Sequence, residues 1–128
     1  MANTTDISPI AIAVETAYVP ERSDPKNMRY VFDYHISITN HTDDVVTLRS
    51  RFWKIVDGNE GVQEVFGDGV VGVQPKLGPN QAFEYSSGAI LATSVGSMQG
   101  HFVMERNDGS QFNAPISPFT LAAPNALH

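Results

Sequence analysis

Alternation between apolar and polar residues constrains this chain more than any other feature. Tyr30, Phe32, Tyr34, Ile36 and Ile38 occupy every second position of one segment. A period of two places one set of side chains on one face of a β-strand. The segment therefore predicts a strand with one buried and one solvated face. The same spacing from residue 10 to residue 18 predicts an earlier strand.

Turn signals separate several further segments of this kind. Strands are expected at residues 45–56, 60–66, 81–87, 98–104 and 112–121. Residues 57–59 and 107–109 read Asp-Gly-Asn and Asn-Asp-Gly, which favour hairpin turns. Ser87 and Gly88 are expected to end their strand. Because Pro115 and Pro118 cannot donate to a ladder, the last strand is predicted to lie at an edge or to be interrupted. Seven or more short antiparallel strands predict an all-β, immunoglobulin-like sandwich.

The strand at residues 45–56 has an irregular pattern. Leu48 and Phe52 share one face of a regular strand, whereas Trp53 lies on the other. A bulge between Ser50 and Trp53 would turn both sets inward, because one extra residue reverses the pleat. We therefore predict such a bulge and a buried Trp53.

Arg49 and Arg51 flank this irregularity. In a regular strand they would form a stripe with Trp53 that could hold a carboxylate or a phosphate. In a bulged strand their stems would cover apolar surface. The bulged arrangement is favoured, and both arginines remain candidates for binding an anion or a partner.

Length and composition limit the classes of protein that the chain can belong to. We expect one domain over the 128 residues, with loose tails at residues 1–7 and 122–128. The net charge of −6 opposes binding to nucleic acid. No segment approaches the roughly 20 apolar residues that span a bilayer, so no membrane partner is expected. With no cysteine and no signal-peptide pattern, the expected location is the cytoplasm.

Residues 67–72 read GDGVVG and match the G-x-G-x-x-G pattern of dinucleotide-binding folds. In those folds a helix follows the glycines and its N-terminus faces the phosphates. Here Pro75 and Pro79 follow, so we predict a structural loop and no helix. Phosphate contact through loop amides is the alternative. Its candidate residues are Gly67, Gly69, Gly72 and Lys76.

Two other groups could carry chemistry. Asp33, His35 and Ser37 resemble a catalytic triad in type, but neighbours on one strand face are roughly 6.5–7 Å apart, too far for a nucleophile and its base. We therefore expect no catalytic site and no enzyme. His41, Asp43 and Asp44 share one turn and could hold a divalent cation, although Asn and Asp also favour turns by themselves. No cofactor is expected.

Several segments together carry a family resemblance. They include YVFDYHISITN from Tyr30, SRFW from Ser50, GDGVVGVQP from Gly67, FEYSSG from Phe83, GSMQG from Gly96 and PISPFTL from Pro115. In this order they closely resemble the bacterial ApaG family from about Ile10 onward. The most specific parts are the glycine loop and the YSSG turn. Two positions depart from the family pattern, Val73 where a glutamate is usual and Phe52 where a histidine is usual.

The resemblance implies a fibronectin-III-like sandwich and a small cytoplasmic protein. Bacterial members of the family are linked to cobalt and magnesium tolerance, and their genes lie beside that of a dinucleoside-tetraphosphate hydrolase. Related domains in eukaryotic F-box proteins and in a DNA polymerase delta-interacting protein look like protein-binding modules. The leading hypothesis is a non-enzymatic domain that binds another protein, and a homodimer is an open alternative. The second hypothesis is a sensor of a divalent cation, or of a phosphate or nucleotide at residues 67–72.

Overall fold

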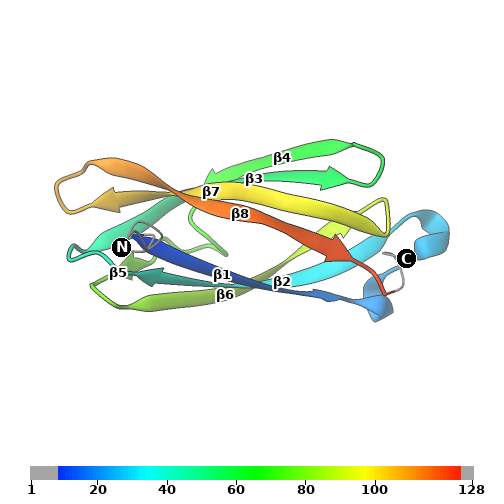
Figure 1. The fold of residues 1–128 in the computed structure, drawn as a ribbon, viewed down its shortest axis with the longest axis horizontal. Helices are drawn as coiled ribbons and strands as arrows, with labels where there is room; N and C mark the ends of the chain where they lie inside the picture. The colour runs from blue at the N-terminus through cyan, green and yellow to red at the C-terminus, as the bar shows by residue number, and fades with distance from the viewer. Residues whose placement is uncertain (1–8, 125–128) are drawn as a thin grey trace, which may run out of the picture.

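Two antiparallel β-sheets pack face to face in the computed structural model, which describes residues 9–124 (Figure 1). The strands are β1 (Ile10–Tyr18), β2 (Tyr30–Asn40), β3 (Val46–Asp57), β4 (Val62–Asp68), β5 (Lys76–Leu77), β6 (Ala82–Leu91), β7 (Val95–Arg106) and β8 (Gln111–Ala122). Two short 3₁₀ turns, η2 (Pro20–Arg22) and η3 (Pro25–Asn27), connect β1 to β2. The predicted all-β sandwich is confirmed. Its likeness to immunoglobulin or fibronectin domains stays a prediction.

The strand order leaves one side of the sandwich open. One sheet runs β1-β2-β6 and the other β4-β3-β7-β8, with β5 paired to the start of β3. Strand β8 lies against β1 and closes one side (Figure 1). The edge strands on the other side are β4 and β6. No helix among residues 9–124 is long and apolar enough to cross a membrane.

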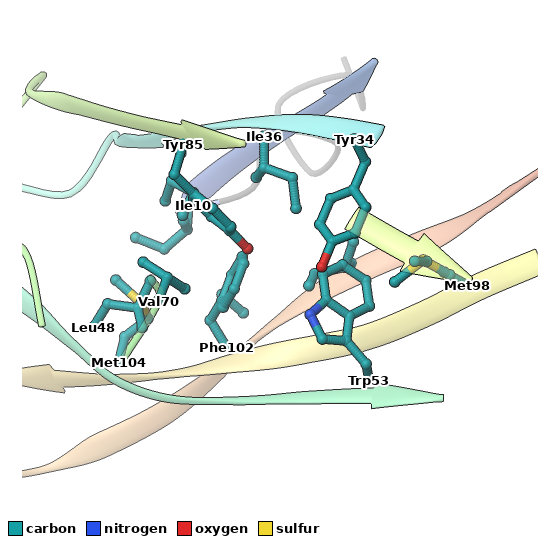
Figure 2. Packing of buried hydrophobic residues seen from close by; sticks show 14 of the residues in the cluster. Ile10, Tyr34, Ile36, Leu48, Trp53, Val70, Tyr85, Met98, Phe102 and Met104 are labelled. Atoms are coloured by element: carbon teal, nitrogen blue, oxygen red, sulfur yellow. The ribbon is translucent and has the colours of Figure 1, made fainter. Parts of the chain in front are cut away.

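The core lies between the sheets and is built from the alternating residues. Tyr34, Ile36 and Tyr85 point inward from one sheet, and Trp53 and Phe102 point inward from the other (Figure 2). Trp53 is only 2% exposed and packs edge-on against Tyr34 with 5.6 Å between ring centroids. The prediction that Trp53 is a core residue is therefore confirmed.

The predicted bulge in β3 exists but lies earlier than expected. The register of β3 against β7 shifts between Leu48 and Ser50, so Arg49 is the extra residue. Leu48 and Trp53 both point into the core, as the pattern requires, because one bulge anywhere between them reverses the pleat. Phe52 does not turn inward. It stacks on His101 of the neighbouring strand with 5.4 Å between ring centroids.

Two other expectations need correction and one is confirmed. Strand β6 continues through Ser87 and Gly88 because both pair with residues of β2. Residues 122 and 123 are not part of a loose tail, since Ala122 completes β8 and the N–H of Ala123 donates to the carbonyl oxygen of Ser94. The other predicted tail residues, 1–7 and 125–128, lie outside the described part of the chain. Strand β8 is an edge strand, as its prolines predicted.

Candidate functional site

Arg51 and the glycine loop form one structural unit at the open side of the sandwich. The Nη1 group of Arg51 donates hydrogen bonds to the carbonyl oxygens of Asp68 at 3.1 Å and Gly69 at 2.8 Å. Arg51 pairs with Gly67 across β3 and β4. A Cβ atom at Gly67 would lie 3.0 Å from the guanidinium group. The glycine therefore leaves the space that the arginine side chain fills.

Arg49 holds the same loop from the bulge. Its guanidinium group donates to Glu105 at 2.8 Å and 3.0 Å and to the side-chain oxygen of Gln74 at 3.3 Å. Its carbonyl accepts hydrogen bonds from Gln74 Nε2 and from the N–H of Gly69. The hydrogen bonds from Arg49, followed by one from Gln111, hold the pKa of Glu105 below its ordinary value. Arg49 is thus bound to an acidic partner within the chain.

The loop after β4 is a tight turn that enters the core. Gly69 has φ +62°, and a Cβ atom there would lie 2.2 Å from the carbonyl oxygen of Val73. Val70 and Val73 exchange two backbone hydrogen bonds, and the Val70 side chain is fully buried. No helix follows, because the chain continues into strand β5. The prediction of a structural loop without a helix is confirmed.

This geometry bears on the candidate phosphate residues. The N–H groups of Gly69, Val70 and Val73 already donate to carbonyls within the chain. They would have to leave those partners to bind a phosphate, in contrast to a preformed amide cradle. Lys76 is exposed on β5, where it pairs with Thr47 and not with the glycines. A phosphate site at Gly67, Gly69, Gly72 and Lys76 stays a prediction.

The candidate metal residues lie on an exposed turn. His41, Asp43 and Asp44 are all exposed. Over residues 9–124, no three histidine, aspartate or glutamate side chains cluster closely enough to hold a metal ion. The buried residue of this turn is Asn40, whose side chain donates to the carbonyl oxygens of Asp44, Leu77 and Gly78 at 2.8–3.1 Å. Asn40 therefore ties the turn to β5, a role that its neighbours in sequence do not reveal.

The polar residues of β2 do not form a triad with one another. Asp33 pairs with Arg22 at 2.9 Å. His35 instead contacts Ser86 through Nδ1 at 2.9 Å and Glu84 through Nε2 at 2.8 Å, both on β6. Sequence reasoning missed this serine–histidine–glutamate group because its members come from different strands. The side chains of His35 and Glu84 are 41% and 60% exposed, so the group lies in water without the dry setting that strengthens catalytic electrostatics.

Strand β4 presents a surface that sequence reasoning also missed. Its outward residues alternate between apolar and acidic, namely Val62, Glu64, Phe66 and Asp68. Phe66 is 70% exposed and Val62 57% exposed. Phe66 of β4 is directly opposite Phe52 of β3 in the antiparallel pair. The alternation was visible in the sequence, but the exposure of the outward face of β4 depends on the strand order.

Comparison with known proteins places the chain in a family. The sequence profile of the ApaG domain matches residues 20–106. The chain belongs to the ApaG family. An ApaG protein from Azotobacter vinelandii is 52% identical over 119 residues, covering 93% of this chain and 94% of that relative. One from Thiobacillus denitrificans is 55% identical over 119 residues, with the same coverage.

A solved structure shows the same ApaG fold. The crystal structure of a protein from Bordetella pertussis, described under the name ApaA, superposes with a TM-score of 0.88 at 45% identity. The match covers 93% of this chain and 98% of that chain. The two departures from the ApaG pattern, Phe52 and Val73, both lie toward the outside of this fold. Phe52 faces away from the core, and Val73 is 46% exposed in the glycine loop.

Proposed function

We propose that this ApaG-family chain is a non-enzymatic binding domain that engages an extended segment of another protein along β4. The observation that carries this proposal is the edge formed by residues 62–68. It combines unpaired backbone groups with two large exposed apolar side chains. An extended segment that adds a strand to such an edge gains main-chain hydrogen bonds and side-chain contacts together.

The other edges are less suited to this role. Strand β8 carries Pro115 and Pro118, and β1 lies against β8. Proline and close covering are the usual protections of an edge strand. Strand β6 has no proline, but its outward residues Glu84 and Ser86 are already bound to His35. Strand β4 contains no proline, and among the strands of residues 9–124 it pairs with β3 alone.

The side chains of β4 indicate the chemistry of the partner. Apolar Val62 and Phe66 alternate with acidic Glu64 and Asp68 on its outward face. Opposite charges and apolar pairs stabilise residues that face each other across a ladder. We therefore expect a partner segment in which apolar residues alternate with lysine or arginine. The net charge of −6 would also speed its approach.

A peptide-binding measurement tests this proposal. A short synthetic peptide that alternates valine and lysine is titrated against the full chain, with a valine–glutamate peptide as control. We expect the lysine peptide to bind and Glu64→Lys to weaken binding at least tenfold. Glu15→Lys is the matched control, because it makes the same change at an exposed position of edge strand β1.

The outcomes separate the possible occupants of β4. Equal loss of binding in both variants would mean general charge attraction and would contradict the proposal. A homodimer that Glu64→Lys disrupts would make a second copy of the chain the occupant and would equally contradict it. The open question of a homodimer is answered by the same samples in sedimentation experiments.

The sensor hypothesis and the link to cobalt and magnesium tolerance stay predictions for this chain, as does a cytoplasmic location. Thermal unfolding in the presence of Mg²⁺, Co²⁺, pyrophosphate or ATP tests the sensor hypothesis. A ligand at 100 times its Kd raises the unfolding free energy by about 2.7 kcal/mol. We expect no such shift with the phosphate compounds, because the N–H groups of Gly69, Val70 and Val73 are occupied within the chain.

A further inference from the structure

A cavity of about 360 Å³ opens between the edge strands β4 and β6. This volume is at the lower end of the range typical of small-molecule sites, roughly 300–1,000 Å³. Residues of both sheets line it, and its polar side chains include Tyr34, Arg51, Trp53 and Ser87. The cavity is distinct from the outward face of β4, because its lining residues on that strand are Gln63 and Val65.

Trp53 lines the cavity, but its unpaired indole nitrogen is buried beneath the surface of the wall. The Nε1 atom of Trp53 makes no hydrogen bond within residues 9–124, although the side chain is 2% exposed. The indole N–H can only donate, and leaving such a group unpaired costs about 1–3 kcal/mol. Figure 2 shows this nitrogen turned toward the hydroxyl groups of Tyr34 and Tyr85 in the space between the sheets. The indole N–H is therefore out of reach of a molecule in the cavity, and Trp53 contributes to the wall through its ring.

The charges around the cavity favour an anion. Arg51 lines the cavity, and no aspartate or glutamate among residues 9–124 does so, in a chain with 14 acidic and 8 basic residues. Only Nη1 of Arg51 is engaged by the glycine loop, and in the described part of the chain Nε and Nη2 donate to no other group. Two parallel N–H groups of a guanidinium match the two oxygens of a carboxylate.

Tyr34 adds a further donor. Burial raises the pKa of its hydroxyl above the ordinary value, and the nearby Ser87 hydroxyl and Arg51 guanidinium oppose that change only in part. The hydroxyl therefore stays protonated at neutral pH and can donate a hydrogen bond. No competing negative charge arises in the cavity.

Most of the remaining side chains that line the cavity are apolar, with Gln63 as a polar exception. Ile55, Val65, Ala89 and Met98 are among the apolar ones. A phosphate would place its remaining charged oxygens against this surface, whereas a carboxylate can carry an apolar body that fills it. We propose that the cavity binds a small carboxylic acid with an apolar body, its carboxylate held by Arg51.

The single tryptophan provides a direct readout. Trp53 is the only tryptophan in the chain, so its indole N–H gives one cross-peak in a ¹⁵N–¹H spectrum of the full protein. The probe is sodium benzoate, and benzamide is the neutral control of the same shape. We expect benzoate to move the indole peak saturably, and benzamide and inorganic phosphate to bind at least tenfold more weakly.

Variants locate the site. Arg51→Gln should weaken benzoate binding at least tenfold, whereas Arg49→Gln, which changes an arginine outside the cavity, should not. Val65→Phe fills the cavity from the edge strand and should abolish the benzoate shift even if Arg51→Gln disturbs the loop. The proposal would be overturned by an indole peak that benzoate does not move or that benzamide moves equally.

Discussion

Asn40 joins two segments, the turn after β2 and the end of β5, through one buried side chain. It is fully buried, donates to three carbonyls and accepts hydrogen bonds from the N–H and hydroxyl of Thr42. A buried polar group is stabilising only while its partners are satisfied, and removing it leaves each of them unpaired. Asn40 is therefore the residue on which the loops at this end of the sandwich depend.

We predict that Asn40→Ala lowers the unfolding free energy by about 3–5 kcal/mol, since several buried groups lose their partner. Urea unfolding measures the change. Asn113→Ala at an exposed position of β8 is the control and should cost less than about 0.5 kcal/mol. Equal costs for the two variants would show that the hydrogen bonds of Asn40 contribute little.

Tyr85 illustrates the opposite case, a buried hydroxyl without a partner in the described part of the chain. We predict that Tyr85→Phe is neutral or stabilises the fold by up to about 1–2 kcal/mol, because the unpaired group is removed. Burial, followed by the nearby Tyr34, raises the pKa of Tyr85. The folded state then holds its proton where the unfolded state, with an ordinary pKa of about 10, has lost it. Stability should therefore fall as the pH rises above about 10.

Thermal unfolding measured from about pH 9 to about pH 11 tests this dependence, because this range spans the ordinary tyrosine pKa of about 10. The decline should be smaller in Tyr85→Phe than in the unchanged chain. A variant that is less stable at neutral pH, or that declines as steeply, would mean that the hydroxyl has a partner after all.

The sequence predicted only some of the hydrogen bonds made by individual side chains. The turn at residue 40 was predicted from the tendency of asparagine to bond its own backbone, and Thr42 N–H does donate to Asn40 Oδ1 at 2.9 Å. The bonds from Asn40 to Leu77 and Gly78 could not be predicted, because they join positions far apart in the chain. The prediction that Arg49 and Arg51 bind an anion or a partner stays a prediction. Their hydrogen bonds to the loop were not foreseen, because they depend on the position of the bulge.

At the scale of elements, the glycine loop and the bulge in β3 depend on each other. Arg49 is the bulged residue, and its carbonyl accepts the N–H of Gly69. The alternation predicted that one bulge must separate Leu48 from Trp53. A bulge at any position between them would let both side chains face the core. The loop contact accounts for its place at Arg49, and that contact is not local in sequence.

Two glycines of this loop allow a matched comparison. Gly69 and Gly72 both have positive φ, but a Cβ atom at Gly69 would collide with Val73, whereas one at Gly72 would meet nothing within 4 Å. We predict that Gly72→Ala costs about 1–2 kcal/mol for the left-handed backbone alone, and that Gly69→Ala costs clearly more. Chemical denaturation of both variants gives the difference. Equal costs would contradict the close approach at Gly69.

The pair of Arg49 and Glu105 links β3 to β7. Because the pKa of Glu105 is lowered in the fold, the contribution of the pair is present above the ordinary glutamate pKa of about 4.3 and is lost as the pH falls through the lower folded value. We predict that Glu105→Gln makes unfolding less dependent on acid pH in this range. Arg49→Gln should do the same, and the pH dependence of unfolding in the double variant should differ little from that in either single variant. Additive effects would mean that the two side chains act independently.

At the scale of the whole molecule, composition and alternation predicted the fold class and the buried tryptophan. They could not predict which edges stay open, because that depends on strand order and on β8 lying against β1. The open side between β4 and β6 is where both the proposed docking strand and the cavity occur. The outward residues of β4 are proposed to contact the protein partner, and the residues that face inward on this side are proposed to contact the carboxylate.

Amide hydrogen exchange tests the docking role of β4 most directly. It is measured by NMR on the full chain with and without the valine–lysine peptide. Exchange should slow at alternate amides of residues 62–68, which point out of the sheet, and stay unchanged in β1 and β8. Peptide binding that leaves β4 exchange unchanged, or that protects β1 or β8 instead, would contradict the proposed function.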